Sequence, residues 1–347
     1  MTLLLLLACG GAPSTDTPTG PPSSTETGTT PTGDTGSGTT PTATSGSTAG
    51  TGSTGSSGTT GDTGTTPTWD CATLPSTPAV SPVLGPPPSE DFAFDELGNL
   101  ASFNGTLLVL TDFAGTSTPI AMSSGSGGGP ASLRYLPGSG HFVFHDVDTS
   151  TLYEVDPVVG SVVPVFSGFG YAGAIEVRSD ELLYVVDLVG VHLIDPTTGD
   201  HELTLERAPW SQPNGATLSV DGATLYVGAS QGVYAVPLDG DGRPNGAPVL
   251  WSAAPAGATE LLGMGVDACD NVYMVGKGSG GSGLLWRYPA GGGAPVALME
   301  RSGFFTNLQW GSGVGGWDDM VLYVVDRAGG VGPGYLAVEV GVPEKPR

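Results

Sequence analysis

Thr217-Leu-Ser-Val-Asp-Gly-Ala-Thr-Leu-Tyr226 decides the fold, because variants of this phrase recur along the 347-residue chain. Each copy joins an apolar run, a polar turn that contains Asp, Gly or Asn, and a second run that opens on Leu-Tyr-Val or a close variant. A fixed period of this kind is the signature of a repeat architecture. The other copies are Phe92–Leu100, Leu133–Phe142, Ile175–Tyr184, Met264–Tyr273 and, with an insertion, Asn307–Tyr323.

The spacing of the copies predicts a six-bladed β-propeller. Their second runs are aligned at residues 100, 142, 184, 226, 273 and 323, in steps of 42, 42, 42, 47 and 50 residues. The region from Ser89 to Val340 holds 252 residues, or 42 for each of six units. Four short strands in a unit of about 40 residues is the pattern of a propeller blade. A seven-bladed propeller or a β-sandwich is the alternative.

Two units also show a second hairpin. Val191–Leu205 and Leu152–Phe166 each alternate apolar and polar residues on both sides of an Asp-Pro-x-x-Gly turn, which is typical of a β-hairpin. Pro164 predicts that the returning strand lies at a sheet edge, where a missing N–H group is tolerated. No stretch has a capped apolar period of 3.6 residues, so we expect an all-β protein.

The N-terminal part of the chain has a different composition. From Gly10 to Thr68 it is almost entirely Thr, Gly, Ser and Pro, with no aliphatic residue larger than Ala. Such a segment has nothing apolar to bury and is expected to be disordered. We therefore divide the chain into a leader (1–9), a disordered tether (10–68), an entering segment (69–88), the propeller (89–340) and a C-terminal tail (341–347).

The charge of the chain argues against a nucleic-acid partner. The formal net charge is −24, and the first basic residue is Arg134. Binding a polyanion requires clustered cations, which ten scattered Lys and Arg residues do not supply. The acidity fits a solvated surface with a weak attraction for cations.

The first nine residues have the features of an export signal. The apolar run Leu3–Leu7 is far too short to span a bilayer but fits the core of a secretory signal. Leu6-Leu7-Ala8-Cys9 resembles a bacterial lipobox. The resemblance implies that Cys9 becomes the lipidated first residue of a membrane-anchored cell-envelope protein. Met1-Thr2 lacks the usual basic residues, and an ordinary cleaved signal with secretion is the alternative.

The two remaining cysteines are candidates for a disulfide. If Cys9 carries the lipid, only Cys71 and Cys269 are left to pair in an exported, oxidising environment. Such a bridge would tie the entering segment to the fifth repeat. Two free thiols are the alternative, because the sequence does not fix the distance between the residues.

The fourth repeat resembles a known family. Gln212–Val227 is similar to the Pro-Asn-Gly … Ser-x-Asp-Gly-x-Thr-Leu-Tyr-Val stretch of the gluconolactonase/regucalcin (senescence marker protein) family. Glu90–Asp95 and Gly263–Asp267 resemble two further family motifs, and the likeness covers about 89–340. It implies a six-bladed propeller with Ca²⁺ or Zn²⁺ at the channel mouth. In that family a Glu, two Asn and an Asp hold the metal, which activates water against a sugar lactone.

Carried over by position, the family's metal site is only half present. Glu90 and Asn214 match two ligands, whereas Ala172 and Leu262 occupy the other two positions. Glu260 lies near the lost Asp. Two oxygen ligands rarely hold a catalytic ion. We therefore predict a monomeric cell-envelope module that binds a small molecule or a protein at the channel mouth, and a Ca²⁺- or Zn²⁺-dependent lactone hydrolase is the alternative.

Other motifs are interpreted as structural. Gly276–Gly281 matches G-x-G-x-x-G but leads into a strand, so it does not present a helix N-terminus to a phosphate. Asp239–Gly246 lacks ligands that an acidic calcium loop requires and is expected to be a hairpin turn. His141 and His145 share one strand face without a partner at ligand spacing, and we interpret them as ordinary blade residues.

Overall fold

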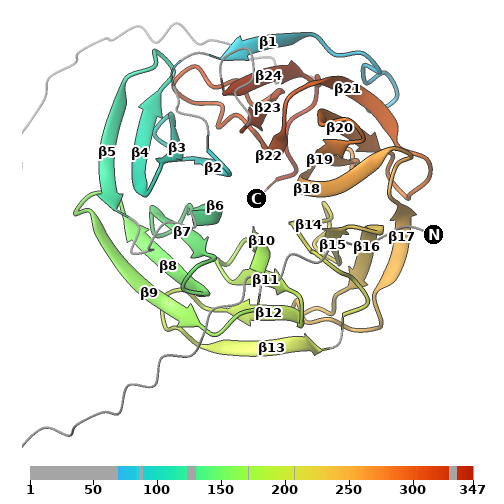
Figure 1. Ribbon diagram of the computed structural model, residues 1–347. Helices are drawn as coiled ribbons and strands as arrows, with labels where there is room; N and C mark the ends of the chain where they lie inside the picture. The colour runs from blue at the N-terminus through green and yellow to red at the C-terminus, as the bar shows by residue number, and fades with distance from the viewer. Residues whose placement is uncertain are drawn as a thin grey trace, which may run out of the picture. The chain divides into compact units, whose positions relative to one another are not determined.

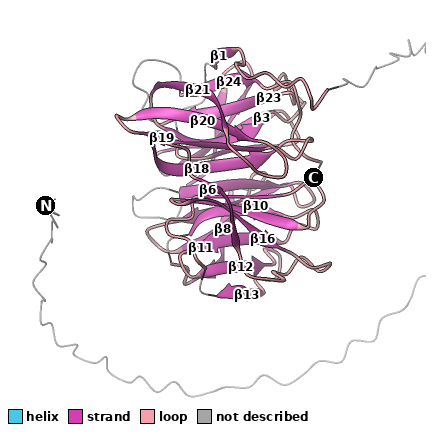
Figure 2. Ribbon diagram, turned by 90° about the vertical axis from the view of Figure 1, so that its right-hand side faces the viewer, coloured by secondary structure: helices cyan, strands magenta, loops and turns pink. Residues whose placement is uncertain are grey.

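The computed structural model describes residues 69–83, 85, 89–122, 130–170, 172–206, 208–327 and 334–346. The predicted leader, with Cys9, and the predicted tether lie outside the described residues. Within the described part, 24 strands form six four-stranded sheets and there are no helices (Figure 2). The prediction of an all-β, six-bladed propeller is confirmed. No helix in the described ranges has the length and apolar character needed to cross a membrane.

Each sheet is antiparallel, and the six sheets are arranged in a ring whose centre we call the channel (Figure 1). From the channel outward, the strands of blades 1 to 3 are β2 (Phe92–Phe94), β3 (Asn99–Asn104), β4 (Leu107–Asp112) and β5 (Ser117–Met122); β6 (Pro130–Leu136), β7 (His141–Asp146), β8 (Thr151–Asp156) and β9 (Ser161–Ser167); and β10 (Ala172–Val177), β11 (Leu183–Asp187), β12 (Gly190–Ile194) and β13 (His201–Glu206).

Blades 4 to 6 follow the same plan, except at the closing blade. Their strands are β14 (Gly215–Leu218), β15 (Thr224–Ala229), β16 (Gly232–Pro237) and β17 (Val249–Ala253); β18 (Ala258–Val266), β19 (Val272–Gly278), β20 (Ser282–Tyr288) and β21 (Val296–Ser302); and β22 (Phe305–Trp310), β23 (Val321–Asp326), β24 (Tyr335–Glu339) and β1 (Val80–Val83).

Blade 6 is completed by the N-terminal strand. β1 pairs antiparallel with β24, with Val80 opposite Val338 and Val83 opposite Tyr335. The segment that the sequence assigns to the approach to the propeller therefore supplies the outermost strand of the last blade. This pairing joins the two ends of the propeller and closes the ring.

The repeated phrase forms the first hairpin of each blade. The second run of each copy is the second strand of a blade: β3, β7, β11, β15, β19 or β23. In the turn of blade 5, Asp267 Oδ1 accepts hydrogen bonds from the N–H groups of Cys269 and Asn271, both at 2.9 Å. Asp95 accepts from Leu97 and Asn99 in blade 1 in the same way. The recurrent Asp therefore shapes the turn through its own side chain.

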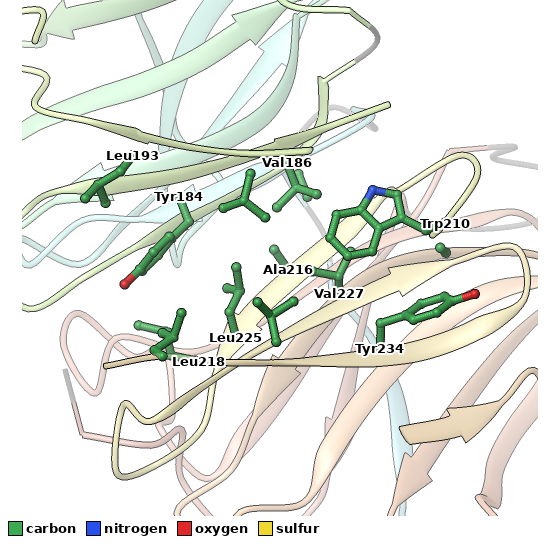
Figure 3. Packing of buried hydrophobic residues seen from close by; sticks show 14 residues of the cluster. Tyr184, Val186, Leu193, Trp210, Ala216, Leu218, Leu225, Val227 and Tyr234 are labelled. Atoms are coloured by element: carbon green, nitrogen blue, oxygen red, sulfur yellow. The ribbon is translucent and has the colours of Figure 1, made fainter. Parts of the chain in front are cut away.

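The main core lies between neighbouring blades. Figure 3 shows how Tyr184 and Val186 of blade 3 face Leu225 and Val227 of blade 4, and these four side chains are fully buried. Trp210, from the loop between the two blades, closes one end of this layer and donates its indole N–H to the Asp187 carbonyl at 3.1 Å. Each fully buried side chain of this size stabilises the fold by about 1.5–3 kcal/mol.

Two predictions about single residues are also confirmed. Pro164 lies in β9, the outermost strand of blade 2. Cys71 and Cys269 form a disulfide with their Cα atoms 5.7 Å apart. The bridge links the segment before β1 to the β18–β19 turn of blade 5. The Arg287 guanidinium, also on blade 5, holds the same segment by donating to the Pro75 carbonyl at 3.1 Å.

Candidate functional site

The innermost strands line the channel, and one residue from each strand, or from the position just before it, lies around one end of the channel. We call this end the upstream mouth and define it by Asp91, Ser132, Gly173, Asn214, Leu262 and Asn307. Contacts between successive blades define this ring. The Asn307 side-chain amide donates to Asp91 Oδ1, and Ser132 Oγ donates to the Gly173 carbonyl at 2.9 Å.

The other half of the ring depends on close approach of the backbones. A Cβ atom at Gly173 would lie 2.7 Å from Asn214 Oδ1 and still closer to the Pro213 carbonyl oxygen. A Cβ at Gly263 would collide with Asn307. These two positions are therefore restricted to glycine, and they bring Asn214 and Asn307 to the edge of the channel.

Glu90, a predicted metal ligand, contacts a cation of its own chain. Its carboxylate pairs with the guanidinium of Arg327, which follows β23 in blade 6. Burial raises the pKa of Glu90, the Arg327 charge lowers it, and the nearby Glu260 raises it, with a net increase. The family resemblance assigns the Glu90 carboxylate as a metal ligand, but Arg327 neutralises its charge.

Asp91 is the buried acid of the upstream mouth. Its Oδ1 accepts the Phe92 N–H at 2.7 Å and lies 3.5 Å from Arg134 Nη1. Burial raises the pKa of Asp91 to about 6, outweighing the Arg134 charge and the Phe92 N–H group, which both lower it. A carboxyl group that is 7 % exposed therefore changes its protonation state in mildly acidic solution.

The structure brings the four predicted positions to this same mouth without making a metal cage. Asn214 immediately precedes β14, Ala172 is the first residue of β10, and Leu262 lies beside Gly263 in β18. In the part of the chain that the structure describes, no group of three or more His, Cys, Asp or Glu side chains is placed to hold a metal ion. Glu90 and Asn214 remain the candidates for a partial site.

The opposite end of the channel contains a second buried ion pair. Glu176 of β10 lies 2.6 Å from Lys345 Nζ, and Thr217 of β14 places its hydroxyl 3.2 Å from the same nitrogen. Both charged side chains are about one-tenth exposed. We call this end, where the innermost strands finish, the downstream mouth.

Lys345 reaches the downstream mouth because the predicted tail is held against blades 5 and 6. The Trp310 indole N–H donates to the Val342 carbonyl at 2.9 Å. The Ala268 N–H donates to the Pro343 carbonyl at 2.9 Å, and the Lys345 N–H donates to the Val266 carbonyl at 3.0 Å. The segment thus extends from blade 6 across the end of β18 to the centre of the ring (Figure 1).

A cavity of about 1040 Å³ opens at the downstream mouth. It is lined by the ends of the innermost strands, by turns of blades 1 to 4 and by the tail. Its charged lining residues are the acids Glu96, Glu176, Asp180, Glu181, Asp221, Asp239 and Glu344 and the bases Arg134, Arg178 and Lys345. We call this space the downstream cavity.

Several of these residues were missed by sequence reasoning. Asp91 is adjacent to Glu90 in the family motif, and its position before an apolar strand was the available signal. Glu176 lies in a repeated phrase, but its neighbours there do not indicate that it faces the channel. Lys345 is separated from Glu176 by 169 residues, so no local pattern connects the two.

The motifs interpreted as structural lie in blade hairpins. Gly276–Gly281 comprises the end of β19 and the β19–β20 turn. Asp239 Oδ1 accepts the N–H groups of Asp241 and Arg243 in the β16–β17 connection. His141 Nδ1 lies 2.7 Å from Glu154 Oε1, and the buried His145 ring contacts Phe169.

Comparisons with known proteins identify the fold. No protein-family model matches the chain, and no curated protein matches its sequence. A putative gluconolactonase structure is similar with a TM-score of 0.61 and 13% identity, over 79% of this chain and 96% of that one. A gluconolactonase from Xanthomonas campestris gives a TM-score of 0.59 and 14% identity, over 77% and 90% of the two chains. Regucalcin from Agrobacterium tumefaciens, described as a calcium-binding protein, gives 0.56 and 18%, over 77% and 93%.

These likenesses confirm the predicted resemblance at the level of the fold. A virginiamycin B lyase from Staphylococcus aureus is also similar, with a TM-score of 0.54, 11% identity and coverage of 71% of this chain and 78% of that one. Structures named for different activities thus share this architecture. The activity must be argued from the residues of the channel and not from the fold.

The buried Asp91 predicts a specific pH dependence of stability. In the folded protein its carboxyl group holds a proton up to about pH 6, whereas the ordinary value is 3.8. Between these values the folded state binds more protons than the unfolded state, so the free energy of unfolding falls as pH rises. In Asp91→Asn this contribution is absent. The free energy of unfolding of Asp91→Asn minus that of the wild type should therefore rise by about 2 kcal/mol from pH 4 to pH 7.

Urea unfolding of both proteins at the two pH values measures this difference. Asp319→Asn, at an exposed position, is the matched control for the loss of one carboxylate. A difference for Asp91→Asn that does not change with pH would show that this carboxyl group titrates normally.

Proposed function

We propose that this propeller is a binding module that takes a small polar ligand in the downstream cavity. The observation that carries the proposal is the cavity of about 1040 Å³ formed by the ends of the innermost strands, by turns of blades 1 to 4 and by the tail. Ligand sites in proteins are commonly preformed concave spaces of about 300–1,000 Å³ with a few placed polar groups. Glu176, Thr217 and Arg134 supply such groups here.

The charges at the upstream mouth support binding over metal-dependent hydrolysis. Ca²⁺ takes six to eight oxygen ligands, yet Glu90 is paired with Arg327 and one family position is Leu262. The Arg327 guanidinium would repel a divalent cation that approaches Glu90. The polar groups of this mouth are used mainly in contacts between blades.

A blocking variant tests the binding proposal. Val220 lines the downstream cavity and is 40% exposed, so Val220→Trp should fill part of the cavity without disturbing the core. We expect members of a panel of small polar metabolites to raise the melting temperature of the wild type, and the same ligands to bind Val220→Trp at least tenfold more weakly. Val158→Trp, at a 91% exposed turn of blade 2, is the control and should bind like the wild type. Equal binding to both variants would place the ligand elsewhere.

A Ca²⁺- or Zn²⁺-dependent lactone hydrolase is the second candidate. It is favoured by the placement of Glu90 and Asn214 at one mouth of the channel and by the gluconolactonase structures that share the fold. Glu90 and Asn214 would hold the ion, with Asp91 nearby. A bound metal would supply a Lewis acid and an activated water.

Metal analysis and a lactone assay distinguish the two functions. We expect the purified domain to contain no stoichiometric Ca²⁺ or Zn²⁺ and to leave sugar and aryl lactones intact, because two ligands and an adjacent arginine do not hold a catalytic ion. Stoichiometric metal with lactone turnover that is lost in Glu90→Gln, but kept in the exposed control Glu339→Gln, would establish the hydrolase instead.

We further propose that the module is exported and anchored to a bacterial envelope membrane through Cys9. The proposal is supported by Leu6-Leu7-Ala8-Cys9 and by the low-complexity stretch that follows it. Mass spectrometry of the mature protein should find a lipidated Cys9 as its first residue, and Cys9→Ser should leave the membrane fraction. An intact Met1 or an unmodified mature N-terminus would contradict the anchor.

A further inference from the structure

We infer that Glu176 and Thr217 form an ammonium-binding subsite in the downstream cavity, and that the ligand is a small aliphatic amine with two or more ammonium groups. Lys345 fills this subsite in the structure, as an occupant supplied by the chain itself. The inference rests on the proposed function, because it names the chemical class of the ligand for the same cavity.

The subsite is built from two adjacent innermost strands. Glu176 Oε1 accepts the Leu218 N–H at 3.0 Å, which fixes the carboxylate of β10 against β14. The ammonium nitrogen of Lys345 lies 2.6 Å from this oxygen and 3.2 Å from Thr217 Oγ1. A carboxylate as buried as Glu176, at 9% exposure, requires a cation or several hydrogen bonds to remain charged. The strands therefore present an acceptor pair that selects a compact, multiply donating cation.

The occupant shows which chemistry fits. A lysine side chain is a primary ammonium on a flexible four-carbon stem, and here its exposed fraction is only 10%. It enters from the tail and not from a blade. The subsite therefore accepts an alkylammonium group that reaches it along the cavity, and a free alkylamine has the same head and stem.

The rest of the cavity favours a second positive charge. Its lining contains seven acidic and three basic side chains. Arg134 and Arg178 are already close to Asp91 and Asp180, at 3.5 Å for the first pair and in direct contact for the second. The side chain of Glu181 is oriented by the Gly138 and Ser139 N–H groups. An excess of carboxylates in one partly enclosed space attracts a diamine more strongly than a monoamine.

Removing the internal occupant tests the inference. Lys345→Met keeps an apolar stem and removes the ammonium group. We expect 1,5-diaminopentane to bind this variant at least tenfold more tightly than the wild type in isothermal titration calorimetry, because it no longer competes with Lys345. Lys345→Met/Glu176→Gln should lose this gain. Lys277→Met is the matched control, since Lys277 lies over the Phe304 ring and not in the cavity, and it should bind like the wild type.

Two results would overturn the inference. One is a folded Lys345→Met protein that does not bind the diamine. The other is diamine binding that persists in the Glu176→Gln double variant or is reproduced by uncharged 1,5-pentanediol. Circular dichroism and the melting temperature establish that each variant is folded.

A measurement on the unmodified protein covers the case in which Lys345→Met does not fold. The chain has only two lysines, Lys277 and Lys345. With ¹⁵N-labelled lysine, saturating diamine should shift the Lys345 Nζ signal and leave that of Lys277 in place. An unchanged Lys345 signal at the highest diamine concentration overturns the inference.

The outcome separates this inference from the proposed function. If diamines fail but other polar ligands still bind in a manner that Val220→Trp weakens, the binding module stands and the ligand class is wrong. If no ligand responds to Val220→Trp, both are wrong.

Discussion

The pairing of β1 with β24 is the constraint on which the rest of the molecule depends. Each blade buries its apolar faces against two neighbours, so an open row of blades would leave two such faces in water. Here Val80 lies opposite Val338 in the last sheet, and the Cys71–Cys269 disulfide ties the approach to β1 onto blade 5. Closure brings blade 1 against blade 6, where the Gln309 amide donates to the Phe92 carbonyl. The channel exists only because the ring is closed.

The charged side chains of the channel form ion pairs between segments that ring closure brings together. Glu90 of blade 1 pairs with Arg327 of blade 6, Asp91 of blade 1 lies beside Arg134 of blade 2, and Glu176 of blade 3 pairs with Lys345 of the tail. A buried ion pair adds little net stability, but loss of one partner leaves an uncompensated charge at a cost of about 3–5 kcal/mol. The two buried pairs, Asp91–Arg134 and Glu176–Lys345, therefore penalise segments that assemble out of position, whereas Glu90–Arg327 is partly exposed.

The blades were predictable because their determinants are local. The recurrent Asp closes its turn within four residues, as Asp267 does with Cys269 and Asn271, and the strands on both sides alternate within the same phrase. β1 has no such phrase. Its sequence Val80-Ser-Pro-Val83 acquires a strand partner only from β24, more than 250 residues later, so periodicity could not assign it to a blade.

The candidate site was less predictable for the same reason. The family resemblance placed Glu90 and Asn214, since each lies in a continuous motif. Arg327 and Lys345 lie outside those motifs, and only the closed ring brings them to the channel. Sequence reasoning could count missing ligands at Ala172 and Leu262, but it could not show that a cation of the chain itself neutralises Glu90.

The two mouths differ in the property that decides what each can bind. At the upstream mouth, the Leu262 side chain offers no oxygen and Arg327 brings a positive charge to Glu90, so both oppose a divalent metal. At the downstream mouth, a carboxylate fixed by a backbone N–H group faces a large cavity with more acids than bases. The upstream mouth is thus poorly suited to hold a metal ion, whereas the downstream mouth is well suited to bind a cationic ligand. The charged side chains at each mouth are therefore a better guide to the function of this protein than the propeller architecture.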